Sequence, residues 1–201
     1  MTFLGLARVE TQEAEAGDII AISGVENINI GDTIADIANP IQLPPINIEK
    51  PTVKMIFSVN NSPFAGQEGQ YCTSRNLKER LEKELDNDVA LQVFSGKSPD
   101  EFIVNGRGEL HLGILIEKMR REGFELQVSK PEVIFQEKDG KTMEPAEDVW
   151  LEAPEKYSGV VIEKMNQRKG EMKNMNVENG IAFFHFFIPT RGLIGFRNEF
   201  L

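Results

Sequence analysis

The chain has 201 residues, of which 40% are hydrophobic and 27% charged, with a formal net charge of -10 at pH 7. This composition is ordinary for a globular protein and excludes disordered, collagen-like and mucin-like chains. The longest apolar runs fall far short of the ~20 residues that a membrane-spanning helix needs, and no signal peptide is expected. Cys72 is the single cysteine and forms no internal disulfide, so we expect a reducing, cytoplasmic location.

The acidity is concentrated at the N-terminal end of the chain. Residues 1–52 carry 2 basic and 8 acidic side chains, residues 53–130 carry 11 and 12, and residues 131–201 carry 9 and 12. An acidic protein does not coat nucleic acid non-specifically, but the nearly balanced remainder leaves room for local basic patches.

The first fifty residues have the pattern of short strands and turns. Gly-Asp pairs precede β-branched runs at residues 19–22 and 33–37, as in an all-β unit. Two or three strands do not close a stable barrel alone, so we interpret residues 1–45 as the end of a larger β domain. Four prolines within residues 39–51 predict an interdomain linker, because proline donates no ladder hydrogen bond.

Residues 46–128 have the periodicity of an α+β domain. Amphipathic helices are predicted over residues 75–86 and about 108–122. Alternating or short apolar runs predict strands at residues 53–59, 89–93, 102–104 and 124–128. The resulting order is βαββαβ, which is the ferredoxin-like unit.

The same order restarts in residues 129–201 and stops before its last strand. The predicted elements are a hairpin of residues 133–135 and 149–151 around an Asp139-Gly140 turn, a helix from Pro154, strands at 170–177 and 181–188, and a helix from Arg191. The strand at 181–188 is apolar on both faces and is predicted to be central. We expect an open sheet edge that frays or pairs with another chain, which would give self-association.

Two glycine-containing loops approach nucleotide-binding motifs but fail on spacing. Residues 96–98, Gly-Lys-Ser, lack the glycine that a P-loop needs five positions earlier, where Leu91 stands. Residues 106–108, Gly-Arg-Gly, precede a helix, but His111 replaces the third glycine of a dinucleotide loop. We interpret both as tight turns, the second with room for an anion beside Arg107.

No catalytic or metal-binding set stands out in the sequence. Two histidines, His111 and His185, and one cysteine at wide spacing do not make a zinc site. His185 is interpreted as a packed strand residue and Cys72 as a small packing residue, although a Cys–His dyad stays open. The carboxylates lie mostly on solvated helix faces and form no evident acid–base pair.

Basic side chains in loops and at helix ends are the better candidates for binding, because such positions suit phosphate contacts. Composition alone favours a merely solvated charged face. The candidates for RNA contact are Arg168, Lys169 and Lys173, then Arg191 and Arg197, and also Arg75 and Lys78. The phenylalanines of residues 183–187 are predicted to be mostly core, without the aromatic, glycine-rich signature of an RNA recognition motif.

Several stretches closely resemble the BipA/TypA family of translational GTPases, and the similarity covers essentially the whole chain. They are residues 53–66, 74–81, 106–117, 168–172 and 191–197. The resemblance implies a C-terminal-half fragment of a parent that also has a GTPase domain and a family-specific C-terminal domain. Residues 1–45 would end the β-barrel domain II, residues 46–128 would be a ferredoxin-like domain III, as in elongation factor G, and residues 129–201 an incomplete domain V.

The same resemblance implies a ribosome-binding role without catalysis in this chain. GTP and magnesium would belong to the parent's GTPase domain, so no catalytic, metal or cofactor-binding residue is expected here. The implied partner is the ribosome, at large-subunit RNA and the factor-binding region, with no membrane or DNA partner. The implied parent acts in translation, large-subunit assembly and stress adaptation, and the seven basic residues would contact the ribosome.

Two other function classes stay open. Paired ferredoxin-like domains can hold a small molecule at their interface, although no polar signature in the sequence supports such a regulatory module. A hydrolase of the acylphosphatase type would need an arginine in the loop at residues 60–66, which has none.

Overall fold

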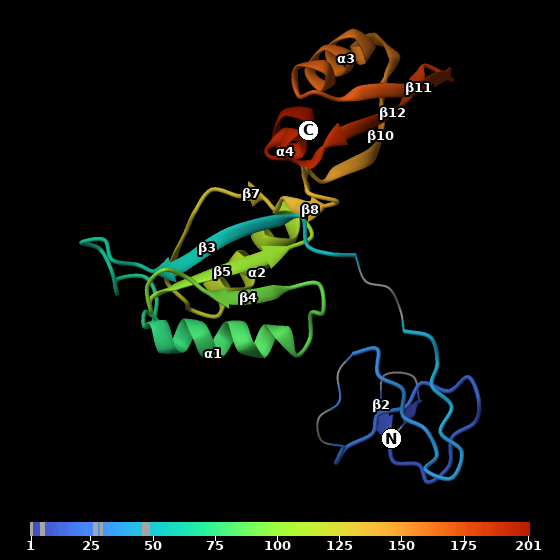
Figure 1. Ribbon diagram of the computed structural model, residues 1–201, viewed down its shortest axis with the longest axis vertical. Helices are drawn as coiled ribbons and strands as arrows, with labels where there is room; N and C mark the ends of the chain where they lie inside the picture. Colours follow the sequence, from blue (N-terminus) through green and yellow to red (C-terminus); the bar gives the residue numbers. More distant parts are fainter. Residues whose placement is uncertain (1, 5–6, 26–27, 29, 46–48) are drawn as a thin grey trace. The chain divides into compact units, whose positions relative to one another are not determined.

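The computed structural model describes residues 2–4, 7–25, 28, 30–45 and 49–201 (Figure 1). The chain divides into two compact units, residues 1–46 and residues 47–201. In the first unit β1 (Thr2–Leu4) pairs antiparallel with β2 (Ala7–Val9). Part of the predicted linker, residues 46–48, lies outside the described residues.

The strands predicted at residues 19–22 and 33–37 are wrong. Both segments are turns or irregular backbone, with Ile20 in a single bridge. Ile19 is 81% exposed and Ile37 96% exposed. The β-branched pattern favours strand, but a strand needs a neighbouring ladder to hold its backbone groups, and among the described residues no ladder includes these segments.

The first half of the second unit is a five-stranded antiparallel sheet with two helices on one face (Figure 1). Its strand order is β4-β5-β3-β6, and β7 pairs with β3 beyond that path. The elements are β3 (Val53–Val59), α1 (Ser74–Leu85), β4 (Gln92–Ser95), β5 (Glu101–Gly106), α2 (Glu109–Arg121), β6 (Leu126–Val128) and β7 (Glu132–Val133).

The core of this half follows the predicted periodicities. Alternate residues Val53, Met55 and Phe57 of β3 are buried, and they meet Leu81 of α1 and Leu112 of α2 in one apolar cluster. Removing each such side chain from water contributes about 1.5–3 kcal/mol. Helix α1 begins where expected, because the Thr73 side chain accepts a hydrogen bond from the backbone N–H of Asn76.

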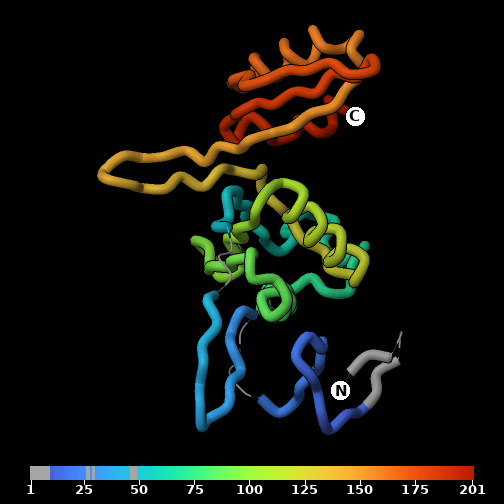
Figure 2. Tube along the Cα trace, turned by 90° about the vertical axis from the view of Figure 1, so that its right-hand side faces the viewer, coloured from blue at the N-terminus to red at the C-terminus, as the bar shows by residue number. Residues whose placement is uncertain are grey.

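The second half is a three-stranded antiparallel sheet of order β10-β12-β11, with a separate β8–β9 hairpin before it (Figure 2). Helix α3 and the C-terminal segment pack on one face of this sheet. The elements are β8 (Gln136–Lys138), β9 (Lys141–Met143), β10 (Ala146–Pro154), a 3-10 turn (Glu155–Tyr157), α3 (Ser158–Gln167), β11 (Glu171–Glu178), β12 (Ile181–Pro189), α4 (Thr190–Leu193) and α5 (Phe196–Phe200).

The hairpin predicted between residues 133–135 and 149–151 is wrong in its pairing. Val133 lies opposite Val53 in the first sheet, and residues 149–151 lie in β10, which pairs with β12. The Asp139-Gly140 turn exists, but it joins the short strands β8 and β9. Period-2 alternation locates strands, and it carries no information about which strands become partners.

Strand β12 is central, as predicted, but its two faces differ. Phe184, Phe186 and Ile188 are buried, whereas Phe183 is 36% exposed and Phe187 40% exposed. The expectation that the phenylalanines are mostly core therefore holds for only one face of the strand. In the described part of the chain no strand pairs with the outer edge of β10.

A carboxylate organises the loop that follows β3. The two oxygens of Glu125 accept hydrogen bonds from the backbone N–H groups of Gly66, Glu68 and Gly69 at 3.0–3.2 Å, and Oε1 also accepts one from Asn60 Nδ2. The Gly66 N–H, then Asn60 and the other donors, hold the pKa of Glu125 below its usual range. The ionised carboxylate is therefore the form that stabilises the loop.

We predict that Glu125→Gln destabilises the protein at neutral pH and has little effect in acid. Because the folded-state pKa of Glu125 is lowered, its stabilisation is present above the unfolded pKa of about 4.3 and is lost as pH falls through the folded value. Urea unfolding of both proteins at neutral pH and near pH 3 measures this. A stability difference that stays constant between these pH values would contradict the prediction.

A partly buried ion network joins α1 to α2. Arg80 Nη1 donates to Glu84 Oε2 at 2.7 Å, and Arg80 Nη2 donates to Glu122 Oε1 at 2.9 Å. Lys118 of α2 completes the network at 3.1 Å from Glu84 Oε1. Burial opposes ionisation of Glu84, but the hydrogen bonds from Arg80 and Lys118 hold its pKa below the usual range.

We predict that Arg80→Ala lowers the free energy of unfolding by about 2–3 kcal/mol, because it leaves the shielded Glu84 carboxylate with reduced compensation. Lys78→Ala is the matched control, since its exposed pair with Glu82 spans 3.7 Å and is worth at most ~0.5 kcal/mol. Urea denaturation compares the two variants. Equal effects would show that burial of the network is unimportant.

Candidate functional site

The seven basic residues predicted to contact RNA lie in both halves of the second unit. Arg75 and Lys78 lie in the first turns of α1. The other five lie in the second half: Arg168 and Lys169 at the end of α3, Lys173 on β11, Arg191 in α4 and Arg197 in α5.

The guanidinium of Arg168 is used within the fold. Nη1 donates to the carbonyl oxygens of Gly192 at 2.7 Å and Ile194 at 3.1 Å, and Nη2 lies 3.0 Å from Glu199 Oε1. The guanidinium also lies over the Phe196 ring, 5.3 Å from its centroid. Arg168 therefore ties the α4–α5 segment to the end of α3 and holds in place the backbone that carries Arg191 and Arg197.

Glycine is required at position 192 by this close approach. A Cβ on Gly192 would lie 2.5 Å from the Arg168 carbonyl oxygen and 3.0 Å from the Ile188 side chain. Both neighbours are fixed, one by the end of α3 and the other by the sheet core. The Arg-Gly pair at 191–192 is thus partly a packing requirement of the fold.

Lys169 ends α3 in a left-handed conformation, with φ of 68°. Its backbone N–H donates to the Asn166 carbonyl at 3.0 Å, as at the C-terminal cap of a helix. The side chain is exposed, and no ion-pair partner for its ammonium group occurs among the described residues. Lys169 is therefore well placed to donate to a phosphate outside the chain.

Most of the remaining candidates form ion pairs. The nitrogen–oxygen distances are 2.7 Å for Lys173–Glu171, 2.5 Å for Arg191–Glu144, 2.8 Å for Arg75–Glu79 and 3.7 Å for Lys78–Glu82. The exposed pairs of Lys173, Arg75 and Lys78 are worth about 0–1 kcal/mol, so a phosphate can replace their carboxylates at low cost. The side chain of Glu144 is only 26% exposed, so loss of its pair with Arg191 would cost more. Arg197 is exposed and makes no ion pair within the described part of the chain.

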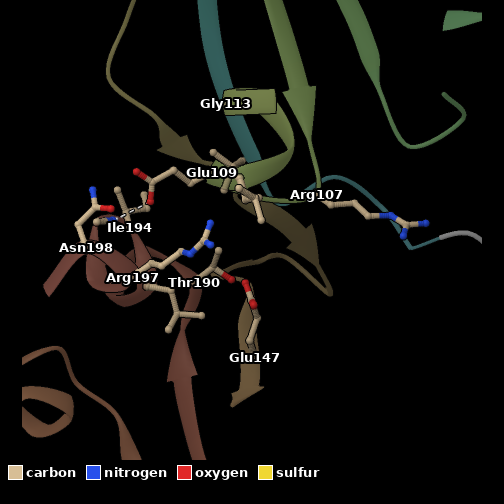
Figure 3. Close-up of a pocket in the computed structure, with 13 residues that line it drawn as sticks. Arg107, Glu109, Gly113, Glu147, Thr190, Ile194, Arg197 and Asn198 are labelled. Carbon is tan, nitrogen blue, oxygen red and sulfur yellow. Dashed lines mark hydrogen bonds between the residues drawn. The ribbon is translucent and has the colours of Figure 1, made fainter. Parts of the chain in front are cut away.

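A cavity of about 380 Å³ lies between the N-terminus of α2 and the α4–α5 segment (Figure 3). Glu109 Oε2 accepts a hydrogen bond of 2.7 Å from the Gly195 N–H, drawn dashed in Figure 3, and so joins its two sides. The lining includes Arg107, Gly108, Glu109, Glu147, Thr190, Ile194, Gly195 and Arg197. Figure 3 shows that the Arg107 side chain extends away from Glu109, Glu147 and Arg197, so Arg197 is the arginine that lies among the two carboxylates.

Both histidines have structural partners. The Arg107 N–H donates to His111 Nδ1 at 3.2 Å, so His111 Nε2 carries the proton and donates to Asp88. Burial opposes ionisation of Asp88, but the hydrogen bond from His111 holds its pKa below the usual range. His185 pairs with Asp148 at 2.7 Å and stacks on Trp150.

The described residues contain no group of three His, Cys, Asp or Glu side chains placed to hold a metal ion. None of their helices is long and apolar enough to cross a membrane. What the site offers is a set of exposed cations on a rigid frame.

Sequence reasoning missed the residues that hold this frame together. Glu109 and Gly195 are separated by 86 positions in the chain, and nothing in either segment indicates their contact. Glu199 was likewise not singled out, although it lies within ion-pair distance of both Lys164 and Arg168. The only usable signal was the position of each residue near a helix end.

We predict opposite effects of substitution at the adjacent residues Arg168 and Lys169. Arg168→Ala should lower the free energy of unfolding by about 2 kcal/mol, because it removes charged hydrogen bonds to two carbonyls. Lys169→Gly should leave stability unchanged or raise it by up to ~1 kcal/mol, because glycine adopts positive φ without strain. Urea denaturation of both variants measures this, and a neutral Arg168→Ala would show that the clamp is dispensable.

Two protein-family models match the chain. The model described as "Elongation Factor G, domain III" matches residues 71–130, and the model described as "Elongation factor G C-terminus" matches residues 141–201. The two matches fall on the two halves of the second unit.

Curated relatives match over nearly the whole chain. The "Large ribosomal subunit assembly factor BipA" of Bacillus subtilis is 54% identical over 99% of the chain, that of Escherichia coli 53% over 98%, and that of Synechocystis 52% over 99%. The chain covers 33%, 33% and 34% of these relatives, so it spans about a third of their length.

Proposed function

We propose that the chain is the ribosome-binding portion of a BipA-type translational GTPase. The chain is a homologue of the BipA family over its whole length, and it matches elongation factor G domain III and C-terminus. It contacts ribosomal RNA and protein in the cytoplasm. The protein of which it is part acts in translation, large-subunit assembly and stress adaptation. The orientation of the ribosome-binding portion couples to the nucleotide state of a GTPase domain. That domain binds GTP and magnesium and catalyses the hydrolysis.

The observation that carries this proposal is the identity of 52–54% with proteins named as large ribosomal subunit assembly factors. The chain offers no nucleotide-binding loop of its own, since its single Gly-Lys-Ser has the wrong spacing. We therefore propose that GTP hydrolysis is carried out outside the third of the relatives that this chain matches.

The sheet topology supports the domain assignment. The order β3-α1-β4-β5-α2-β6 with sheet order β4-β5-β3-β6 is that of a ferredoxin-like domain III. The order β10-α3-β11-β12 corresponds to the same unit without its last strand, as in domain V. That residues 1–45 are the end of the barrel is a proposal that rests on the resemblance alone. Since β7 pairs with β3, we propose that domain III ends after Val133 instead of at residue 128.

In the contact surface that we propose, some basic residues hold the backbone in place and others contact RNA. Arg168 holds α4 and α5 in place. Lys169 and Arg197 present charged groups that form no ion pair with a carboxylate in the described structure. Lys173 can exchange its exposed carboxylate partner for a phosphate, and Arg75 and Lys78 are candidates of the same kind on α1. Arg191 is a candidate through its own exposed side chain, and its partner Glu144 is only 26% exposed.

We predict that the chain co-sediments with large ribosomal subunits in a salt-sensitive manner, and that Lys169→Glu/Arg197→Glu weakens binding. Two lost phosphate contacts should reduce the slope of log affinity against log salt by roughly 2. Lys83→Glu/Lys97→Glu is the matched control, because it makes the same charge change at two exposed lysines of the first half. Equal losses in both double variants would contradict specific contacts at Lys169 and Arg197.

One observation favours a second candidate function. The cavity at α2 and α4–α5 has the volume of a small-ligand site, which would suit a regulatory module that binds a small molecule. The melting temperature of the protein should be measured with a set of metabolites and, separately, with RNA. Stabilisation by a metabolite and not by RNA would favour the second function.

A further inference from the structure

The β10–β12–β11 sheet has an exposed aromatic face on the side opposite to α3 and α5. Strand alternation places Trp150, Phe183, His185 and Phe187 there, because their neighbours Phe184 and Phe186 point into the core. We call these four residues the aromatic face. Trp150 is 71% exposed, and Phe183 and Phe187 are 36% and 40% exposed.

The rings of this face are held in place. Trp150 lies directly opposite His185 in the ladder, and their rings stack with centroids 4.6 Å apart and planes inclined by 4°. His185 is fixed in turn by its contact with Asp148. A ring whose orientation is already fixed in the free protein loses little conformational entropy when a partner stacks on it.

The charges around the rings are mostly negative. The ladder register places Asp148 and Glu171 beside Phe187, Glu152 beside Phe183, and Glu178 beside Ile181 on the same face. Lys173 lies 5.5 Å from the Phe187 centroid, and it is paired with Glu171. The face therefore combines exposed aromatic rings with an excess of carboxylates.

We propose that the aromatic face binds an arginine- and lysine-rich protein segment. A guanidinium stacks on Trp150 or Phe183 while its donors reach the neighbouring carboxylates, which satisfies both features of the face at once. Aromatic rings on central strands also stack RNA bases in RNA recognition motifs. Here the surrounding carboxylates oppose a phosphate backbone, so charge complementarity selects the basic protein segment.

This inference goes beyond the proposed function, because it rests on the aromatic rings and the carboxylates of the sheet face. Lys173 is the one basic residue that both proposals involve, and here it enters only as the partner of Glu171. The proposed binding does not depend on the ribosome, because any partner with an exposed basic segment could occupy the aromatic face. Lys169→Glu/Arg197→Glu should accordingly leave it unchanged, so failure of ribosome co-sedimentation and failure of this inference are separate results.

The experiment is a titration with a short peptide of alternating arginine and glycine, with the same peptide carrying glutamate for arginine as negative probe. Trp150 is the only tryptophan in the sequence, so its fluorescence reports on this face directly. We expect a saturable fluorescence change with the arginine peptide and none with the glutamate peptide. Anisotropy of a labelled arginine peptide should show about tenfold weaker binding to Trp150→Ala and to Glu152→Lys/Glu178→Lys.

Matched controls separate the face from general charge or aromaticity. Phe64→Ala removes a ring that is 70% exposed on the first half, and Glu137→Lys reverses a charge on the exposed strand β8. Neither should change the affinity. The proposal is overturned if the arginine peptide does not saturate, if Glu137→Lys weakens binding as much as Glu152→Lys/Glu178→Lys, or if oligouridine binds more tightly than the peptide and gains affinity in the lysine variants.

Discussion

Each half of the second unit depends on one central strand whose alternate residues are buried against helices. In β3 these residues are Val53, Met55 and Phe57, and in β12 they include Phe184 and Phe186. Because side chains alternate in direction along a strand, burial of one set fixes the register of the sheet and the position of every loop at its ends. The cationic ends of α3 and α4 and the exposed rings of β12 are consequences of the same constraint.

The sequence was sufficient for elements whose pattern repeats over several turns or strands. Helices α1 and α2 lie where periodicity placed them, and β12 is central as its apolar run indicated. Pairing was harder to predict. Val133 joins a strand 80 positions earlier in the chain, and the runs at 19–22 and 33–37 form no strand, because partner choice depends on contacts that a local pattern does not contain.

The candidate site shows the same limit in chemical terms. Residue type and position correctly suggested cations at loops and helix ends, but whether a cation is available depends on its partners. Arg168 bonds to carbonyls 24 and 26 positions later, so a residue that looked suited to phosphate is part of the frame. Phe183 and Phe187 show the converse, since a run that looked uniformly apolar in sequence divides into a buried set and an exposed set in the sheet.

The second half consequently presents two unlike surfaces from one small sheet. The side covered by α3 and α5 carries cations at the helix ends, and the other side carries aromatic rings among carboxylates. A phosphate backbone suits the first surface and a basic protein segment suits the second. Lys173 is an RNA-contact candidate and also lies 5.5 Å from the Phe187 centroid, but the two surfaces are otherwise built from different side chains. Each can therefore be altered while the sheet keeps the other in place. A particle made of RNA and basic protein would engage both at once, and two modest contacts on one rigid body give a tighter combined attachment than either alone.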